Sequence, residues 1–333
     1  MASGVLICAI MAVSVMVCVG VVWNSFNLIM TIQKQLKTKS VQTMSLIIIS
    51  ISINNNTLVL SCFFMVVIIS LNPLFICTTV AQPQYLTLLF LWMSSSCMSF
   101  WSMAWLSVFY CVKVVNFSTE CLRALKRNIS VITNTALMLS CVGSFILFFP
   151  FFTLHLPEAE PGATSGTSGV NNTSDPSYLT CSLPVFSPLI IADAYTVSFM
   201  SFLCPLPLAI MLPTSIRMVI YLCQHMLTLR KNQTQVQSLD SYLSVCKLNV
   251  SLAGVYLITL LIVALFFVLR LIGLNVSYLL IIFGFSFYCI MTAALLTASK
   301  TYLRRKFWSM CCCKKTQEET ISEITQMTKT EVA

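Results

Sequence analysis

The sequence predicts an all-α membrane protein, folded as a bundle of seven transmembrane helices. Its 333 residues are 58% hydrophobic and only 9% charged, whereas an ordinary soluble domain is about 25% charged. Apolar runs of about 18 or more residues with almost no charge recur along the whole chain. Each run can cross a hydrocarbon core of about 30 Å as a helix, which satisfies its own backbone hydrogen bonds in lipid.

The apolar runs define the expected spans in chain order. The first has no basic segment before it and no small-residue cleavage site, and it is longer than the apolar part of a signal peptide, so we expect it to remain as a span. The fifth is longer than a bilayer requires, and we expect it to extend past the membrane. The expected spans are residues 4–32, 43–70, 85–112, 128–156, 186–222, 246–270 and 275–301.

The Lys and Arg residues fall almost entirely in alternate connections between these spans. Of the 19, only Arg270 lies in a connection of the other set. Cytoplasmic loops carry an excess of Lys and Arg, so the pattern predicts an outer N-terminus and a cytoplasmic C-terminus, with a seven-span domain at 1–303 and a cytoplasmic tail at 304–333. The net charge of +9 therefore reflects topology in a lipid bilayer, and we expect no nucleic-acid partner.

The second outer loop, residues 157–185, is rich in Gly, Ser, Thr and Pro, which predicts a flexible and solvated segment. It holds two overlapping N-x-[ST] sequons, which begin at Asn171 and Asn172. Because this loop is expected outside the cell, the sequence predicts N-glycosylation here.

Most of the 16 cysteines lie within the spans, where a thiol behaves as a small buried hydrophobic group. Cys77 and Cys181 are both expected on the oxidising outer side, where a disulfide and two free thiols remain alternatives. A run of three cysteines follows the last span beside two lysines, which is typical of reversible palmitoylation but equally of plain cytosolic thiols. These three are Cys311, Cys312 and Cys313.

Catalytic patterns are missing from the sequence. The two histidines, His155 and His225, fall near opposite faces of the membrane, and no H-E-x-x-H or G-x-S-x-G pattern occurs. We therefore expect no enzyme, no cofactor and no metal site. A transporter would carry intramembrane charges and internal repeats, whereas the spans hold almost none except Asp193 and Arg217 towards the two ends of the fifth.

Polar residues of the spans form two layers. On the third span four residues share one helical face that can line a cavity, although helix packing through small residues would produce the same pattern. On the first and second spans we interpret the polar residues as interhelical hydrogen-bonding groups. The outer layer comprises Trp92, Ser96, Ser99 and Met103, with Ser95 adjacent; the inner comprises Asn24, Ser50, Asn54, Thr57 and Ser61.

Three segments carry more specific patterns. They are "LSVFYCVKVVNFS" at 106–118, "LPLAIMLPTSIRMVIYLCQHMLTL" at 206–229 with its closing L-x-x-H, and "DSYLSVCKLNVSLAGVY" at 240–256. They resemble the third, fifth and sixth spans of the type 2 (bitter) taste receptors, a G-protein-coupled receptor family. The resemblance implies a GPCR-like bundle in the plasma membrane that binds small organic bitter agonists and activates a heterotrimeric, gustducin-like G protein.

The resemblance also implies two sets of site residues, one at each end of the bundle. The agonist would bind between spans three, five, six and seven, and the G protein at the cytoplasmic mouth, where Tyr110 and Lys113 occupy the place of the ionic lock of rhodopsin-like receptors. The expected agonist set is Trp92, Ser95, Ser96, Ser99, Thr196, Phe199, Tyr256, Thr259 and Phe283, of which Thr259 and Phe283 are added by helical spacing. The expected coupling set is Tyr110, Lys113, His225 and Lys247.

Several positions depart from the family pattern and indicate a divergent branch. Ser96 stands where an Asn is usual, Tyr242 where a His is usual, and Ala298 replaces the Asn before the final Ser-Lys. Two alternatives stay open from sequence. One is a vomeronasal-type chemoreceptor, which the L-x-x-H and the F-Y-x-x-K run disfavour; the other is a membrane transporter, which the scarcity of intramembrane charge disfavours.

Overall fold

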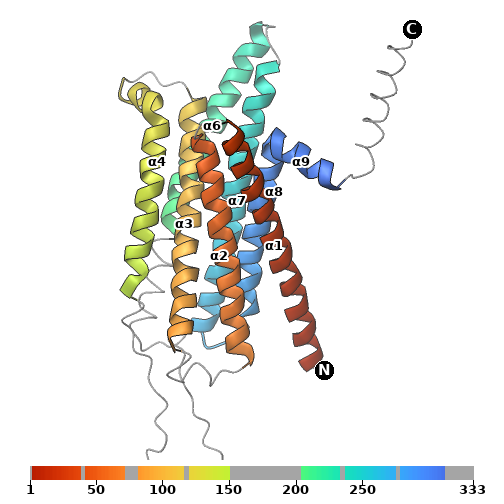
Figure 1. Cartoon of the computed structure of the whole chain (residues 1–333). Coiled ribbons are helices and arrows are strands. Elements are labelled where there is room, and N and C mark those ends of the chain that lie inside the picture. Colours follow the sequence, from red (N-terminus) through yellow and green to blue (C-terminus); the bar gives the residue numbers. More distant parts are fainter. Residues whose placement is uncertain are drawn as a thin grey trace, which may run out of the picture.

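The computed structural model describes residues 2–38, 42–71, 82–115, 120–150, 204–232, 237–274 and 278–311, and within these ranges all regular structure is helical. Figure 1 shows the helices running side by side as one bundle. They are α1 (Ala2–Thr38), α2 (Thr43–Leu71), α3 (Gln82–Val114), α4 (Glu120–Phe148), α6 (Pro205–Asn232), α7 (Gln237–Leu271), α8 (Leu279–Ser299) and α9 (Thr301–Cys311).

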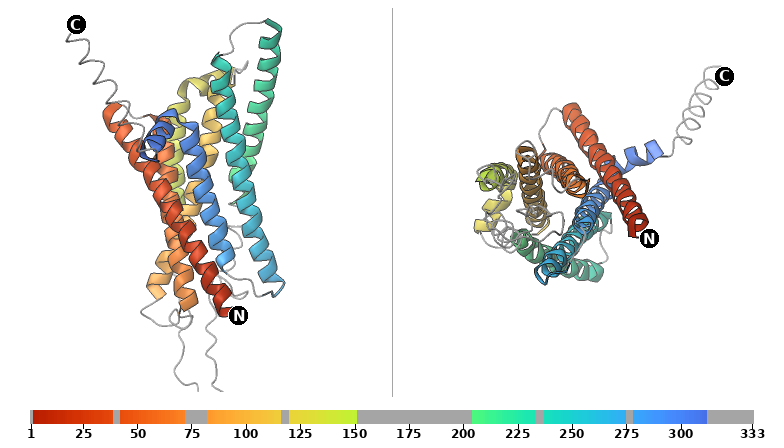
Figure 2. Two further views of the ribbon diagram at one scale, coloured as in Figure 1. Left: turned by 90° about the vertical axis from the view of Figure 1, so that its right-hand side faces the viewer. Right: turned by 90° about the horizontal axis from the view of Figure 1, so that it is seen from below.

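Seven of these helices, α1 to α8, are long and apolar enough to cross a membrane, which confirms the predicted fold class. The eighth, α9, is short and leaves the end of α8 at a steep angle, at the end of the bundle opposite the N-terminus of α1 (Figures 1 and 2). Several spans differ from their expected bounds. Helix α4 begins at Glu120 instead of residue 128, and α7 begins at Gln237 instead of residue 246. Helix α1 continues to Thr38 instead of ending at 32, and α6 continues to Asn232 instead of ending at 222.

Helix α3 is the centre of the bundle. It packs against α2, α4, α6 and α7, and 72% of its most apolar stretch is buried, against 22 to 56% for the other spans. The outer helices expose large apolar side chains such as Met11 and Met138, which are 63% and 66% exposed. Such exposure suits a lipid environment, where an outward apolar residue costs nothing.

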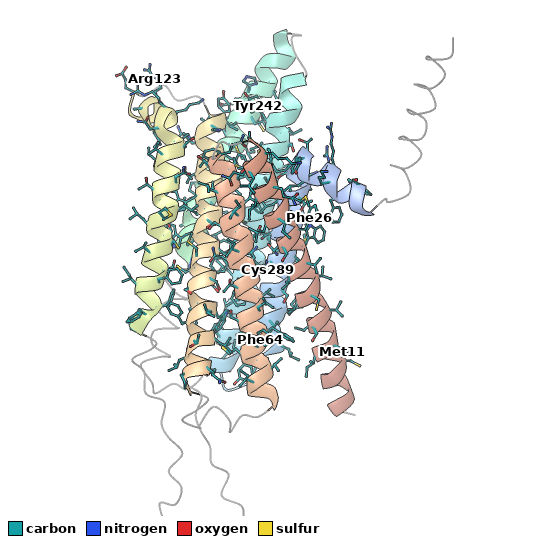
Figure 3. All side chains as sticks on the ribbon, viewed as in Figure 1. Met11, Phe26, Phe64, Arg123, Tyr242 and Cys289 are labelled. Carbon is teal, nitrogen blue, oxygen red and sulfur yellow. The ribbon has the colours of Figure 1, made fainter. Side chains whose placement is uncertain are left out.

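Basic side chains gather at one end of the bundle, named here the basic end. Figure 3 places Arg123 and Tyr242 at this end, and Phe64 and Met11 towards the other. The basic end holds the C-termini of α1, α3 and α8 and the N-termini of α4 and α7, with α9 beside them. Its basic residues include Lys34, Lys37, Lys113, Arg123, Lys126, Arg127, Lys247 and Lys300.

Candidate functional site

Trp92 is fully buried in the half of α3 that lies away from the basic end. Its ring lies edge-on to the ring of Phe285 on α8, with the centroids 5.8 Å apart. The indole Nε1 is buried, and within the described ranges it has no hydrogen-bond partner. Because a buried N–H without an acceptor costs free energy, Trp92 carries an unsatisfied donor in the interior of the bundle.

The serines beside Trp92 have already used their hydroxyl protons. Ser96 Oγ donates to the carbonyl of Trp92 at 2.7 Å, and Ser95 Oγ donates to the carbonyl of Leu91. Their oxygens therefore offer lone pairs, the acceptor side of a hydrogen bond. Ser96 is hydrogen-bonded to the backbone of Trp92, whereas Ser95 lines a groove between α2, α3 and α4.

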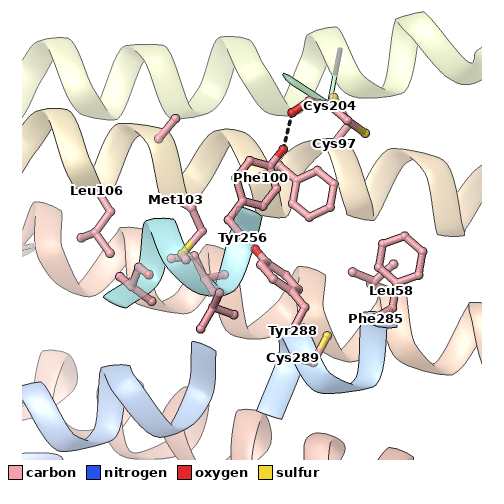
Figure 4. Packing of buried hydrophobic residues seen from close by; sticks show 14 of the residues in the cluster. Leu58, Cys97, Phe100, Met103, Leu106, Cys204, Tyr256, Phe285, Tyr288 and Cys289 are labelled. Carbon is pink, nitrogen blue, oxygen red and sulfur yellow. Dashed lines mark hydrogen bonds between the residues drawn. The ribbon is translucent and has the colours of Figure 1, made fainter. Parts of the chain in front are cut away.

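Three aromatic rings form a layer about two helical turns along α3 from Trp92, nearer the basic end. Phe100 of α3 packs on Tyr256 of α7 and Tyr288 of α8, with ring centroids 4.6 and 5.3 Å apart. The Tyr256 hydroxyl donates to the carbonyl of Cys204, at the start of α6 (Figure 4). This layer joins α3, α6, α7 and α8, the helices between which the agonist was expected.

The remaining predicted agonist residues are placed less uniformly. Thr259 is buried and donates to the carbonyl of Val255 at 2.9 Å. The structure does not bring Phe283 to this layer, because its side chain is 42% exposed on α8. Several predicted residues lie outside the described ranges: Thr196, Phe199, Asn171, Asn172, Cys77, Cys181, Cys312 and Cys313; Cys311 is the last residue of α9.

A hydrogen-bond network joins four helices; the sequence predicted an interhelical hydrogen bond for Asn24 but did not single out Asn55, which lies at the centre of the network. Asn55 Nδ2 donates to Asn24 Oδ1 at 3.2 Å, and Ser99 Oγ donates to Asn55 Oδ1 at 2.6 Å. Ser99 Oγ also lies 2.9 Å from the Tyr288 hydroxyl. The network therefore ties α1, α2, α3 and α8 together, and it gives Ser99 a structural role as well as its expected place on the α3 face.

A second network lies nearer the basic end. Asn249 Nδ2 of α7 donates to Ser107 Oγ of α3 at 2.9 Å and to Ser215 Oγ of α6 at 2.8 Å. Ser107 Oγ is in turn 2.6 Å from Thr214 Oγ1. The sequence feature that could have predicted this network is Asn249 itself, an asparagine inside an apolar span. Such a side chain faces other helices, because lipid offers it no hydrogen-bond partner.

Cationic and aromatic groups meet at the basic end. Tyr110 is buried, and Lys300 Nζ lies 5.5 Å from the centroid of its ring. Lys113 Nζ lies 4.6 Å from the ring centroid of Phe109. Burial lowers the pKa of Lys300 to about 8, with smaller contributions from the charges of Lys34 and Lys113. The sequence predicted Tyr110 and Lys113 at this site but assigned no role to Lys300.

The other two predicted coupling residues are accessible at the same end. Lys247 is exposed near the start of α7, and His225 is exposed on α6 with its ring centroid 6.0 Å from that of Tyr221. The predicted coupling set thus lies together at the basic end, on α3, α6 and α7. Lys300, at the C-terminal end of α8, lies at the same end of the bundle.

Comparison with known proteins gives consistent matches. A family model described as "Taste receptor protein (TAS2R)" matches residues 1–315. Taste receptor type 2 member 40 of Gallus gallus is 48% identical over 54 residues, 16% of this chain and 17% of that protein. Taste receptor type 2 member 4 of Mus musculus is 29% identical over 126 residues, and that of Rattus norvegicus 28%.

The pairwise matches are partial. The two rodent matches each cover 37% of this chain, and 40% and 39% of the relatives themselves. They therefore span less than half the length of these relatives. The family match is much more extensive, since it leaves only the last part of the tail outside. The chain accordingly belongs to the taste receptor protein (TAS2R) family, whose members are seven-span bitter taste receptors of the plasma membrane and not enzymes.

Proposed function

We propose that this chain is a receptor for small organic bitter compounds and activates a heterotrimeric, gustducin-like G protein. The observation that carries the proposal is the composition of α3. It bears a buried indole with an unpaired donor at Trp92 and, nearer its other end, Tyr110 and Lys113 among the lysines of the basic end. One central helix therefore links a neutral aromatic site to a cationic one.

The agonist site that we propose is neutral and has both donor and acceptor groups. Trp92 supplies an N–H and a ring face or edge, and Ser96 supplies an acceptor oxygen. We also assign to this site Thr196 and Phe199 of the fifth expected span, which lie outside the described residues. Such a site suits chemically varied organic compounds, which share apolar surface and one or two polar groups rather than a common charge.

Activation follows as a population shift. An agonist that binds one bundle arrangement better than another shifts the equilibrium by its difference in affinity. The aromatic layer of Phe100, Tyr256 and Tyr288 lies between Trp92 and the network of Asn249, so α7 is the helix through which we propose that the change reaches the basic end.

The orientation that we propose puts the basic end in the cytoplasm and the N-terminus outside. It rests on the excess of Lys and Arg at one end. The same orientation puts Asn171 and Asn172 where glycans are added, and Cys311, Cys312 and Cys313 where palmitoylation enzymes act. An epitope tag at the N-terminus should then be stained on intact cells, and a C-terminal tag only after permeabilisation.

A calcium-release assay tests the proposed function. Cells co-expressing the receptor and a promiscuous chimeric Gα are challenged with a panel of bitter compounds. We expect Trp92→Ala to raise the half-maximal agonist concentration about tenfold or more, since the aromatic contact and the hydrogen bond are lost together. Tyr110→Ala should lower the maximal response while agonist binding persists.

Phe283→Ala is the matched control, because Phe283 is an aromatic residue with 42% of its side chain exposed. Its removal should shift the half-maximal concentration by no more than about twofold. Silence of the wild-type receptor across a broad panel, despite normal surface staining, would contradict the proposal. Equal shifts in Trp92→Ala and Phe283→Ala would contradict the proposed agonist site while leaving the receptor function intact.

A further inference from the structure

A cavity of about 500 Å³ lies against α9, the short helix that follows the last span. Its volume falls within the range of roughly 300 to 1,000 Å³ that is typical of small-molecule sites. The side of α9 that faces it is opposite to Phe307, whose ring stacks on Trp23 of α1. The described residues that line the cavity are Thr301, Tyr302, Arg305, Lys306 and Ser309.

Each of these five side chains carries a hydrogen-bond donor, and none is a carboxylate. They offer three hydroxyls, a guanidinium and an ammonium group. Tyr302 is partly exposed and the other four are exposed, so a ligand can reach all of them. Within the described part of the chain, none of the five forms a side-chain hydrogen bond or an ion pair. Such a lining suits an anion.

Three lysines extend this positive charge towards the bundle. Lys34 Nζ of α1 lies 5.9 Å from the ring centroid of Tyr302, and Lys300 directly precedes α9. The charges of Lys34 and Lys113 both contribute to the lowered pKa of Lys300, so the three ammonium groups are close enough to repel one another. No described carboxylate pairs with any of them. A bound anion would relieve this repulsion.

The cavity lies at the level of the lipid head groups. Ser299 ends the last span and Lys300 follows it, so α9 begins where the membrane ends. Because α9 leaves α8 at a steep angle, it runs across the end of the bundle instead of continuing outward (Figures 1 and 2). In the orientation proposed above, this level is that of the cytoplasmic leaflet, which contains anionic lipids.

A phosphate monoester matches the lining better than other anionic groups of lipids do. It carries nearly two negative charges near neutral pH and three acceptor oxygens. A guanidinium binds such a group through two parallel hydrogen bonds, and an ammonium binds it as a point charge. A phosphodiester or a carboxylate carries a single charge, which leaves part of the positive charge of Arg305, Lys306 and Lys34 without a counter-charge.

We propose that this cavity binds the phosphorylated head group of a phosphoinositide in the cytoplasmic leaflet. Arg305 and Lys306 hold a phosphate monoester, the hydroxyls of the lining donate to its remaining oxygens, and Lys34 adds positive charge beside Tyr302. The site uses α9 and the end of α1, away from the proposed agonist site. It rests on the proposed orientation, and neither the agonist nor the G protein takes part in it.

Native mass spectrometry of the purified full-length receptor in detergent tests this site, because it counts bound lipids. The probe is a phosphatidylinositol bisphosphate; phosphatidylinositol and phosphatidylserine, which have no phosphate monoester, serve for comparison. We expect the bisphosphate to bind at least about tenfold more tightly than either. Arg305→Gln and Lys306→Gln should each raise its apparent Kd about fivefold, and the double variant should raise it more than either alone.

Arg304→Gln is the matched control. It removes the same charge from the same helix, but Arg304 is exposed and is not among the residues that line the cavity. Its apparent Kd should stay within about twofold of wild type. All three substitutions replace exposed side chains, so the thermal midpoint of each variant should match that of wild type.

Three results would overturn the proposal. Equal binding of phosphatidylserine and the bisphosphate, or equal losses in Arg304→Gln and Arg305→Gln, would show that the basic end attracts anions without a defined site. Inositol trisphosphate, which has the head group but no acyl chains, should displace the lipid only at a much higher concentration than unlabelled lipid does. Equal potency would exclude the lipid as the source of the phosphate.

The readout needs no agonist, no G protein and no bilayer. Failure of this proposal is therefore distinct from failure of the proposed receptor function, which the calcium-release assay tests. The epitope tags test the orientation separately.

Discussion

Asn55 on α2 joins its own helix to α1 and α3 in the membrane-embedded part of the bundle. Its side chain is fully buried, donates to Asn24 on α1 and accepts from Ser99 on α3. Interhelical hydrogen bonds in membranes contribute about 0.6 kcal/mol each on average. We expect Asn55→Leu to lower the free energy of unfolding by about 1 to 2 kcal/mol, because it also leaves the partners unpaired.

Equilibrium unfolding in bicelles or detergent measures this change. Asn54→Leu is the matched control, because the hydrogen bonds that Asn54 donates go to Ser50 on the same helix. Asn54→Leu should lower the free energy of unfolding by less than half as much as Asn55→Leu. Equal losses in the two variants would show that the four-helix network contributes no more than a bond within one helix.

The sequence located the polar residues of α2 but not their faces. Spacing of four, three and four grouped Ser50, Asn54, Thr57 and Ser61, and the structure places the first three of them on the groove towards α3 and α4. The neighbouring Asn55 instead faces the centre. Three consecutive asparagines cover most of a helix circumference, so periodicity alone cannot decide which of them is buried.

Lys300 predicts a dependence of stability on pH. Burial, and then Lys34 and Lys113, lower the pKa of Lys300 to about 8 in the folded chain, below its ordinary value of 10.5. Between these two values the unfolded chain binds more protons than the folded one, so stability should rise as pH rises from 8 towards 10.5. The Tyr110 ring, 5.5 Å from Lys300 Nζ, offsets part of the burial cost.

Thermal midpoints between pH 7.5 and 10 check this expectation. The rise across the window should be smaller in Lys300→Met than in wild type. Lys37→Met, at an exposed lysine in the last turn of α1, should keep the wild-type rise. Parallel profiles for wild type and Lys300→Met would mean that Lys300 titrates alike in both states.

At the scale of the element, α9 is held by aromatic contacts with α1. Phe307 stacks on Trp23 with ring centroids 5.5 Å apart and planes 4° apart, and its ring lies edge-on to Phe26 at 5.7 Å. Trp23 Nε1 also donates to Thr297 Oγ1 of α8 at 3.0 Å. Trp23 thus joins the last span and α9 to α1.

Phe307→Ala should loosen α9 without affecting the spans. Loss of an aromatic pair of about 1 kcal/mol should lower hydrogen-exchange protection of residues 301–311 roughly fivefold. Trp308→Ala is the control, since Trp308 is the next residue and is 60% exposed. If both variants exchange at the wild-type rate, the stacking on Trp23 does not hold α9.

The existence of each span was predictable, but bounds and outward faces were not. Length and hydropathy identify a membrane crossing, whereas α4 starts at Glu120 because a helix can continue into the polar region beyond the membrane. Phe283 was assigned to the agonist wall by helical spacing, yet it is 42% exposed. Lipid is as apolar as a protein core, so a uniformly apolar helix carries no sequence signal for its buried face.

At the scale of the whole molecule, the proposed agonist and G-protein sites lie towards opposite ends of one bundle. Helix α7 contacts both regions, through Tyr256 in the aromatic layer and through Asn249, which bonds to α3 and α6. If both ligands favour one arrangement, each must raise the affinity for the other by the same factor. This reciprocity distinguishes a coupled bundle from two independent sites.

Asn249→Leu should therefore weaken coupling while leaving each site intact. The change removes the hydrogen bonds to Ser107 and Ser215, so the relative positions of α3, α6 and α7 no longer distinguish the two arrangements as strongly. Coupling factors in allosteric proteins are typically about 5 to 150-fold, and we expect a decrease of roughly tenfold. Agonist affinity in the absence of G protein should change little.

Two titrations measure the factor from both sides: agonist binding with and without G protein, and G-protein binding with and without agonist. Val250→Ala, at the next and 45% exposed position of α7, should keep the wild-type factor in both. A folded Asn249→Leu receptor with wild-type coupling would exclude this network as the link. A fall in agonist affinity measured in the absence of G protein would show instead that the variant had damaged the agonist site directly.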